Sequence, residues 1–465
     1  MTTQGIAVQA SPARFALAGA VSNRWNELPE TGRLVVVLAM HAVLGLAMRQ
    51  LSPLATLHTF ATILTVIAIS LSTRNPAVVL MCACYVSGAE VLWRMSNAYT
   101  FHETAKYVVS LLCFLGLIRL KTVRLPGHAV LYLALLLPAA VYPFVYFSFD
   151  LFRRHVLFNL SGPIALTMAV LFCSNLRISA GELWRACVAF AAPLSGVLMV
   201  TVRSSYMQEV KFGTESNFQT SGGFGPNQVA SSLAMGALLV LMGALLARTG
   251  RWQRVMLAGL AAAFTLQSAM TFSRGGVISL GLALVVAGPL VLSGHRYKRQ
   301  ILAGVTGVAL VLAVAFPLVN AYTGGKLVER FADKKMSGRE RLTAADWEAF
   351  QNNPVFGVGA GISKYFHPNA IAAHTEYTRA LAEHGLLGVA AYLSLLWLLL
   401  RRTAAILEAR ESRPYRGLLL ALLVWPLTYM VVNAMRTSAP GLSIGMAFLT
   451  VLPGAVLAQK ERFAR

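Results

Sequence analysis

The longest polar stretch of this chain is residues 321–384, whose sequence is AYTGGKLVERFADKKMSGRERLTAADWEAFQNNPVFGVGAGISKYFHPNAIAAHTEYTRALAEH. The sequence on both sides of it consists mainly of apolar runs about 20 residues long, the length of a helix that spans a bilayer. All other connections between these runs are much shorter. Because long loops that are not disordered are usually functional, we expect a membrane-embedded bundle whose chemistry involves this loop.

The composition is that of a polytopic membrane protein. Of the 465 residues, 57% are hydrophobic and 12% are charged, and the mean hydropathy is +0.63. A soluble globular protein has about 25% charged residues. The formal net charge of +22 fits contact with anionic membrane lipids and phosphorylated substrates better than nucleic-acid binding, so we expect no nucleic-acid partner.

The cysteines are predicted to be buried free thiols. Their number is odd and all of them fall in apolar runs, which argues against a disulfide framework or a metal site. They are Cys82, Cys84, Cys113, Cys173 and Cys187.

Fourteen apolar runs predict the membrane-spanning helices. Several exceed about 18 residues, the length that indicates a spanning helix rather than a core helix. The first run is short, and only Arg49 and Gln50 separate it from the second. The sequence therefore predicts an all-α polytopic membrane protein with 12–14 transmembrane helices. The runs cover approximately residues 34–48, 51–72, 77–95, 104–120, 127–148, 155–174, 184–202, 226–247, 253–271, 276–293, 299–320, 385–400, 414–434 and 440–458.

We expect five segments along the chain. A cytoplasmic tail at 1–33 is followed by a transmembrane bundle at 34–320 and a loop subdomain with short helices at 321–384. C-terminal transmembrane helices at 385–459 and a cytoplasmic tail at 460–465 complete it. The first segment lacks the charged, apolar and cleavage-site regions of a signal peptide, so we expect it to be a tail.

The distribution of Lys and Arg predicts the orientation. With the N-terminus in the cytoplasm and an even number of helices, the basic clusters of the short loops fall inside and the long loop faces outward, as the positive-inside rule requires. The clusters are Arg119/Lys121/Arg124, Arg177/Arg185, Arg248/Arg251/Arg254, Arg296/Lys298/Arg299, Arg401/Arg402/Arg410/Arg413/Arg416 and Lys460/Arg462/Arg465.

Basic residues in several outer turns run against this rule. Their side chains are explained either by interfacial snorkelling or by a shared anionic ligand, and their number favours the ligand. These residues are Arg153, Arg154, Arg203, Lys211 and Arg274. Arg binds phosphate oxygens through its planar fork and stays charged at any working pH.

The sequence contains no recognisable metal-binding motif, so we expect neither a metal nor a cofactor. Asp346 and Glu348 stand two residues apart in an expected helix, which points them to different faces, and we interpret both as solvated surface residues. A negative charge that develops on a leaving group would then be stabilised by Arg and Lys.

The sequence GRERLTAADWEAFQNNP within the loop predicts an amphipathic helix. Its first turn contains Arg339 and Arg341, both candidate anion ligands. The side chains predicted to pack are Leu342, Ala345, Trp347 and Phe350.

A glycine-rich turn, FGVGAG, follows this helix. Simple chain flexibility explains it better than a phosphate cradle, because the full dinucleotide-binding pattern and its strand are missing. Next, AHTEYTRALAEHGLLG predicts a helix that continues into the following span, with His374 in its first turn. His374, His367 and His384 share this loop. A histidine here is either a base for a sugar hydroxyl or an interfacial capping residue.

Three motifs in this order carry a family resemblance: SRGG in an outer turn, SGR..L...W..F..NPVFGVGAG in the loop, and AHTEYTRALAEHGLLG before the next span. The chain resembles the O-antigen ligase and polymerase superfamily of bacterial inner membranes, by motif over roughly residues 220–400 and by topology throughout. Within that superfamily it looks most like the lipopolysaccharide O-antigen ligases.

The resemblance implies a metal-independent glycosyltransferase of the membrane-embedded GT-C class. It would transfer O-antigen polysaccharide from undecaprenyl pyrophosphate to a sugar of the lipid A core, on the periplasmic face of the inner membrane of a Gram-negative bacterium. The family's catalytic histidine falls on His374, and its pyrophosphate-binding arginines fall on Arg274 and on Arg339 or Arg341. The family often has Asn after the histidine, where this chain has Thr375.

Two alternatives stay open at this stage. An O-antigen polymerase uses the same lipid-linked donor but another lipid-linked glycan as acceptor, and the sequence separates it poorly from a ligase. A polysaccharide transporter or flippase is less favoured, because such proteins show ionisable residues within their spans and matching interrupted helices in two halves. Here Glu90 is the main acidic residue in an apolar run.

Overall fold

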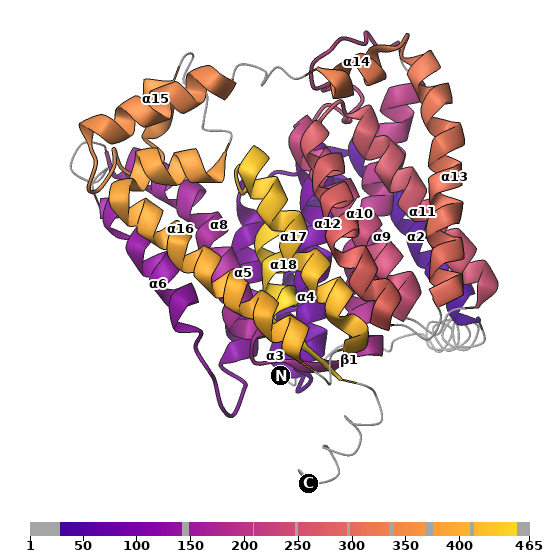
Figure 1. Ribbon diagram of the computed structural model, residues 1–465, viewed down its shortest axis with the longest axis horizontal. Coiled ribbons are helices and arrows are strands. Elements are labelled where there is room, and N and C mark those ends of the chain that lie inside the picture. Colours follow the sequence, from indigo (N-terminus) through magenta and orange to yellow (C-terminus); the bar gives the residue numbers. More distant parts are fainter. Residues whose placement is uncertain are drawn as a thin grey trace, which may run out of the picture.

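The computed structural model describes residues 28–141, 148–207, 209–246, 250–294, 298–333, 339–367, 375–409 and 413–452. Each of the fourteen expected apolar runs contains a helix (Figure 1). These helices are α2 (Glu30–Gln50), α3 (Ser52–Ser72), α4 (Pro76–Met95), α5 (Thr104–Leu117), α6 (Gly127–Leu136), α8 (Phe149–Cys173), α9 (Ala180–Tyr206), α10 (Pro226–Leu246), α11 (Arg251–Met270), α12 (Arg274–Gly294), α13 (Lys298–Tyr322), α16 (Glu376–Glu408), α17 (Arg416–Val432) and α18 (Ala439–Ala447).

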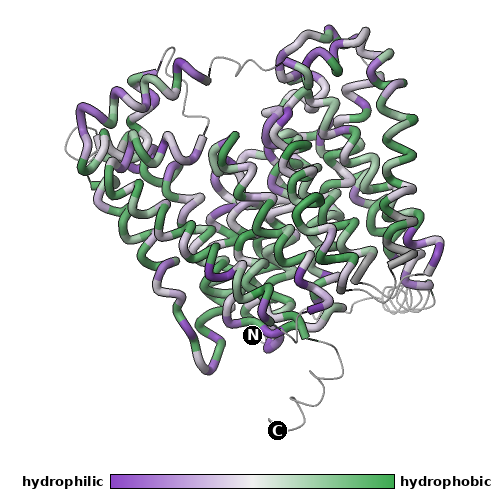
Figure 2. Tube along the Cα trace, viewed as in Figure 1, coloured by the Kyte–Doolittle hydropathy of each residue, from purple (hydrophilic) through white to green (hydrophobic). Residues whose placement is uncertain are grey.

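The predicted fold class is confirmed. Within the described residues, ten helices are long and apolar enough to cross a membrane, and α5 and α6 are shorter apolar helices. Figure 2 shows hydrophobic residues along the bundle and hydrophilic residues mainly at its two ends, including the loop helices. The chain is therefore an all-α, multi-pass membrane protein. The cysteine prediction is also confirmed, since all five are buried and free.

Local sequence explains where several helices begin. Asn75 accepts a hydrogen bond from the backbone N–H of Ala77, and Pro76 stands at the first helical position of α4, where its missing N–H costs nothing. Ser179 and Glu182 form a capping box at the start of α9, each binding the other's backbone N–H. These caps satisfy helix-terminal N–H groups that would otherwise lack partners.

The helices divide into a buried centre and a lipid-facing periphery. The most apolar windows of α4 and α10 are each 78% buried inside the protein, whereas those of α2 and α13 are 17% and 6% buried. Exposed apolar side chains on peripheral helices are expected where lipid replaces protein as the neighbour. A polar site inside the protein is therefore expected around the central helices.

One end of the bundle carries the long loop, and we call it the loop end. Within the loop, α14 (Lys326–Ala332) lies beside α11–α13, whereas α15 (Arg339–Asn352) lies over α16 (Figure 1). The 3-10 turn η1 (Ser363–Phe366) contacts both α15 and α16. Each half has its own apolar cluster. One contains Met270, Phe272, Val319 and Leu327, and the other contains Ala349, Val358, Ile362 and Ala382.

At the opposite end, two short strands pair in parallel. β1 (Arg177–Ser179) follows α8, and β2 (Thr450–Leu452) follows α18, with Ile178 in register with Val451. Arg402 of α16 donates to the carbonyls of Ala447 and Leu449 at 2.8 Å each. These contacts tie the last described segment to β1 and to α16.

Candidate active site

Arg274 opens α12 at the loop end and contacts the first half of the loop. Its guanidinium donates to the backbone carbonyl of Asp333, directly after α14. The adjacent glycines allow close packing: a Cβ on Gly275 would lie 2.6 Å from the Asn433 amide nitrogen, and one on Gly276 would lie 2.6 Å from the Ala230 carbonyl. The SRGG glycines thus face protein groups of neighbouring segments.

Arg203 lines a cavity of about 490 Å³ at the loop end, and Arg49 lines it too. Arg49 ends α2 and donates to the Met95 carbonyl at 2.8 Å. In the amide orientation that matches its neighbours, Gln50 Oε1 accepts two hydrogen bonds from Arg203, at 2.7 and 3.2 Å. The other lining residues are Leu46, Gln50, Val200, Ser204, Gln219, Gly222 and Gly223. Two guanidinium groups with polar neighbours form a suitable site for a phosphorylated ligand.

The other predicted arginines lie on surface-facing positions or outside the described side chains. Arg153 is exposed in α8 and pairs with exposed Asp150 at 3.3 Å, a contact of little energetic value in water. Arg154 and Arg341 are also exposed. Arg339 is the first residue of α15, and its side chain lies outside the description.

His374, the predicted base, lies outside the described residues, which resume at Thr375. His367 is described and buried, and its Nε2 lies 2.7 Å from Asp346 Oδ1. Both side chains are at most 1% exposed. The interpretation of Asp346 as a solvated residue is therefore wrong: the turn at 363–367 packs on α15 and removes this carboxylate from water.

The packing face of α15 also differs from the prediction. Leu342 and Ala349 are buried as an apolar helix face requires, but Trp347 is 51% exposed. Asp346 takes the inward position between them. The buried face of α15 therefore includes Asp346, which pairs with His367, in place of the predicted Trp347.

The glycine-rich turn is ordered and packed against α16. Gly357, Gly359 and Gly361 all have positive φ, between 69° and 99°, a region open mainly to glycine. The backbone N–H groups of Val358 and Gly359 donate to the carbonyls of Ala382 and Glu383. The turn is therefore a docking element that holds the second half of the loop on the bundle.

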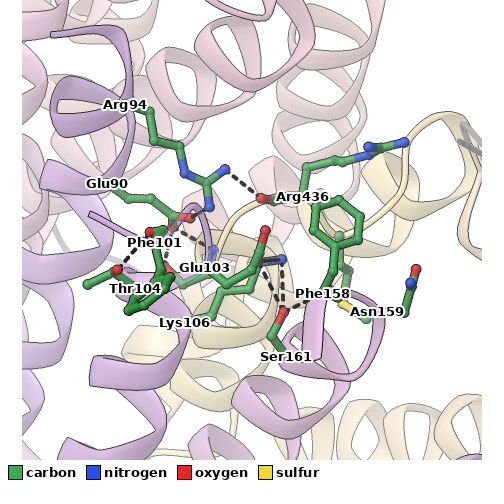
Figure 3. A network of polar contacts seen from close by, with 12 residues as sticks. Glu90, Arg94, Phe101, Glu103, Thr104, Lys106, Phe158, Asn159, Ser161 and Arg436 are labelled. Atoms are coloured by element: carbon green, nitrogen blue, oxygen red, sulfur yellow. Dashed lines mark hydrogen bonds and ion pairs between the residues drawn. The ribbon is translucent and has the colours of Figure 1, made fainter. Parts of the chain in front are cut away.

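A network of buried charged groups joins α4, α5 and α8 at the loop end (Figure 3). Glu90 and Arg94 of α4 form an ion pair at 2.5 Å with side chains 1% and 7% exposed. Lys106 of α5 pairs with Glu103, and Ser161 of α8 donates to Glu103 at 3.0 Å. Buried charges are costly unless they are paired and hydrogen-bonded in this way.

The connection between α17 and α18, residues 433–438, is fastened to this network, and we call it the 433–438 turn. The backbone N–H of Met435 donates to Glu376 Oε2 at 2.8 Å. The N–H and hydroxyl of Ser438 donate to Glu90 Oε2 at 2.7 and 2.6 Å. Arg94 donates to the carbonyl of Arg436 at 2.9 Å. Two carboxylates from distant helices thus fix one short turn.

Arg379 continues the network into α16. It pairs with Glu376 and donates to Asn159 of α8 at 3.1 Å. Arg436, in the turn, lies with its guanidinium carbon 5.9 Å from the centre of the Phe158 ring. Burial and the nearby Arg379 lower the pKa of Arg436. This guanidinium is therefore a partly desolvated cation.

His102 lies beside the same network, before α5. Its ring stacks on Phe158 with centroids 6.4 Å apart. Burial and the charge of Arg94 lower its pKa to about 4. Burial would raise the pKa of Glu103, but the charges of Lys106 and Arg94 outweigh it and the pKa is lowered. His102 is thus neutral at physiological pH, and it is too weak a base to remove a proton from a sugar hydroxyl efficiently.

Within the described parts of the chain, no three His, Cys, Asp or Glu side chains come together as a metal site would require. The polar chemistry of the loop end is instead that of guanidinium, ammonium and carboxylate groups from α2, α4, α5, α9, α12 and α16.

Comparison with known families adds one finding. The family model described as O-antigen ligase matches residues 263–393. The match covers 131 of the 465 residues and supports the resemblance to the O-antigen ligase superfamily over that segment. No curated protein matches the sequence significantly. The match supports a membrane enzyme of the O-antigen ligase or polymerase type, a glycosyltransferase that acts in polysaccharide assembly.

The O-antigen ligase match begins in α11 and ends in α16, so it includes α12 and the whole loop. Arg274, Arg339, Arg341 and His374 all fall inside it. The cavity arginines Arg49 and Arg203 fall outside, as do Arg94, Lys106 and Arg436 of the buried network.

Sequence reasoning missed several charged residues that the fold gathers at the loop end. The missed residues are Arg49, Arg94, Glu103, Lys106, Glu376, Arg379 and Arg436. A signal was present, because Glu90 and Arg94 stand four residues apart in an apolar run, and intramembrane charges usually face the protein interior. The involvement of the 433–438 turn had no local signal.

Proposed function

We propose that the chain is an O-antigen ligase that transfers polysaccharide from undecaprenyl pyrophosphate to a sugar of the lipid A core. The observation that carries this proposal is the family match over residues 263–393, which includes the expected base and three of the expected phosphate-binding arginines. Basic clusters on the short connections support placing the loop end on the periplasmic side of a bacterial inner membrane.

The proposed reaction is a single displacement at the anomeric carbon of the donor. His374 takes the proton from the acceptor hydroxyl while that oxygen forms a bond to the anomeric carbon. The bond from this carbon to the pyrophosphate oxygen breaks, and its electron pair leaves with undecaprenyl pyrophosphate. The proton then passes from His374 to solvent, so charge and atoms balance.

The arginines at the loop end support binding of the departing pyrophosphate. Arg203 and Arg49 share one cavity, and Arg274 stands at the first position of α12, where the helix dipole also favours negative charge. A well-placed donor that stabilises developing negative charge is worth about 3–4 kcal/mol in the transition state. No metal is needed in this scheme.

The test separates ligation from its nearest alternatives. Purified protein in lipid vesicles would receive lipid-linked O-antigen with and without lipid A core, and the products would be resolved on gels. Core-linked polysaccharide that forms only with the core supports a ligase. Longer lipid-linked glycan without the core would indicate a polymerase, and the absence of any covalent product in both samples would indicate a transporter.

We expect His374→Ala and Arg274→Ala each to reduce core-linked product to background, by at least 100-fold, because each removes a group that acts in the transition state. Product formation in vesicles is the measurement, after normalisation to membrane protein. His128→Asn is the matched control, since His128 contacts Ser394 within the bundle, far from the loop. Normal ligation by well-expressed His374→Ala protein would refute the assignment of the base.

A further inference from the structure

Three hydrogen bonds to charged side chains hold the backbone of the 433–438 turn. Its backbone N–H groups at Met435 and Ser438 bind carboxylates of α16 and α4, and its carbonyl at Arg436 accepts from Arg94. Glu376 and Glu90 are each 1–2% exposed. Hydrogen bonds to ionised groups are about twice as strong as neutral ones, particularly when buried. The turn therefore presents Arg436 from a rigid base.

The Arg436 side chain projects away from the groups that hold its backbone. In Figure 3 its guanidinium points away from the Glu90–Arg94 pair and lies above the Phe158 ring. Lys106 approaches the same ring at 5.9 Å, and His102 stacks on it. Arg436 and Phe158 are both half-buried, so they remain in part accessible from the loop end.

This combination suits one class of ligand. A guanidinium fork binds phosphate or carboxylate oxygens in a bidentate manner, and an aromatic face beside it covers the apolar face of a ring. Because Arg436 is partly desolvated, its attraction to an anion is screened less than at an open surface. An anionic sugar meets both requirements, whereas a neutral sugar uses only the aromatic face.

We infer that Arg436, together with the Phe158 ring, binds an anionic sugar group of the acceptor glycolipid. The inference rests on the proposed function, because it assigns the acceptor to this place. The proposed function assigns the pyrophosphate of the donor to Arg203, Arg49 and Arg274, which lie on α9, α2 and α12. The 433–438 turn is instead bonded to the start of α16 through Glu376, the part of the chain that directly follows the proposed base.

The first experiment measures steady-state kinetics with purified donor and lipid A core. Arg436→Gln should raise KM for the acceptor about tenfold and leave KM for the donor unchanged, which corresponds to loss of one charged hydrogen bond. Arg203→Gln should do the reverse. Lys326→Ala, which removes an exposed loop-end cation paired with Glu329, should change neither value. Unchanged acceptor KM in folded Arg436→Gln protein would overturn the inference.

A second variant keeps the test decisive if Arg436→Gln does not fold. Arg436→Lys keeps the charge but loses the fork, so a smaller rise in acceptor KM is expected, with thermal stability close to that of the wild type. If Arg436→Gln fails to fold, this variant decides: acceptor KM equal to that of the wild type would overturn the inference.

The second experiment identifies the anion by direct binding. Lipid A core would be used untreated, after removal of its phosphates, and after reduction of its carboxyl groups. We expect either phosphate removal or carboxyl reduction to weaken binding to the wild type about tenfold, and the effective treatment identifies the anionic group that Arg436 binds. The same treatment should not change binding to Arg436→Gln. Equal binding of all three samples to the wild type would overturn the inference. Arg436-dependent binding without any transfer by the wild type would contradict the proposed function alone.

Discussion

Single residues at the loop end differ mainly in what surrounds their charge. Arg153 and Asp150 are exposed and form a contact that water and salt weaken. Arg94 and Glu90 also form an arginine–carboxylate pair, but inside the protein, where loss of one partner would leave an uncompensated charge. The sequence alone does not show which pair is buried, because both consist of an arginine and a carboxylate at the spacing of helical neighbours.

His102 provides a pH test at the residue scale. Its pKa of about 4, compared with an ordinary value of 6.5, means that the folded protein keeps the imidazole neutral. The unfolded chain binds more protons between these values, so this residue contributes stability that is lost as pH falls from 6.5 through 4. His102 therefore becomes protonated only at a pH below the range of an activity assay.

We expect His102→Gln to leave the apparent pKa of the acidic limb of kcat against pH unchanged between about pH 5 and 8, the range in which an ordinary histidine titrates. The measurement is ligation rate against pH for wild-type and variant protein at saturating substrates. A shift of that limb in the variant would show that His102, rather than the proposed base, controls it.

At the scale of elements, the position of α15 and η1 depends on the glycine-rich turn and on a kink in α16. Gly385 interrupts α16 with φ 58° and ψ −141°, and its backbone approaches the carbonyl of Pro354. The glycine-rich turn binds the carbonyls at Ala382 and Glu383 just before this kink. The helix α15 therefore sits on a platform whose shape only glycines permit.

Gly357→Ala tests this platform. Gly357 has φ 69°, and a Cβ there would lie 2.4 Å from the backbone carbonyl carbon of Glu383, so the turn must shift. We expect a loss of about 1–3 kcal/mol in local stability from strain of this kind. Hydrogen exchange should show faster amide exchange over residues 339–367 than in the wild type.

Gly281→Ala is the matched control for this change. Gly281 lies within α12 with no atom within 4 Å of an added Cβ, and Ala is favoured over Gly in helices. Its exchange pattern in the loop should equal that of the wild type. If Gly357→Ala also leaves loop exchange unaltered, the turn is not the element that holds α15.

For the whole molecule, the two halves of the loop rest on different parts of the bundle. Arg274 contacts the half that contains α14, and α15 with η1 covers α16 (Figure 1). The 433–438 turn reaches α4 through Glu90 and α16 through Glu376. Cations from α2, α4, α9, α12 and the 433–438 turn therefore meet at one end of the bundle.

Orientation in the membrane is a whole-molecule property that cysteine labelling can test. The native cysteines are all buried, so a membrane-impermeant maleimide should report only new ones. We expect Lys326→Cys, at the loop end, to be labelled in intact spheroplasts. Lys121→Cys, exposed at the opposite end, should be labelled only after permeabilisation. The reverse pattern would contradict a periplasmic loop.

Part of the candidate site was also predictable from the sequence. Outer-turn basic residues against the positive-inside rule pointed to Arg203 and Arg274, and Arg203 does line a cavity. The sequence of the loop helix did not predict that Asp346 is a buried partner of His367, because a carboxylate on a polar helix normally faces water. The roles predicted for Arg339, Arg341 and His374 stay predictions.

The sequence by itself determined the helices, the fold class and the position of the loop. Each apolar run of about 20 residues partitions into a membrane according to its own composition and closes its own backbone hydrogen bonds, so no distant residue is needed to specify it. Only the tertiary structure decided which charged groups meet. Glu90 and Ser438 are 348 residues apart in the chain, and their contact depends on how α4 and the α17–α18 connection pack, a relationship that no local pattern encodes.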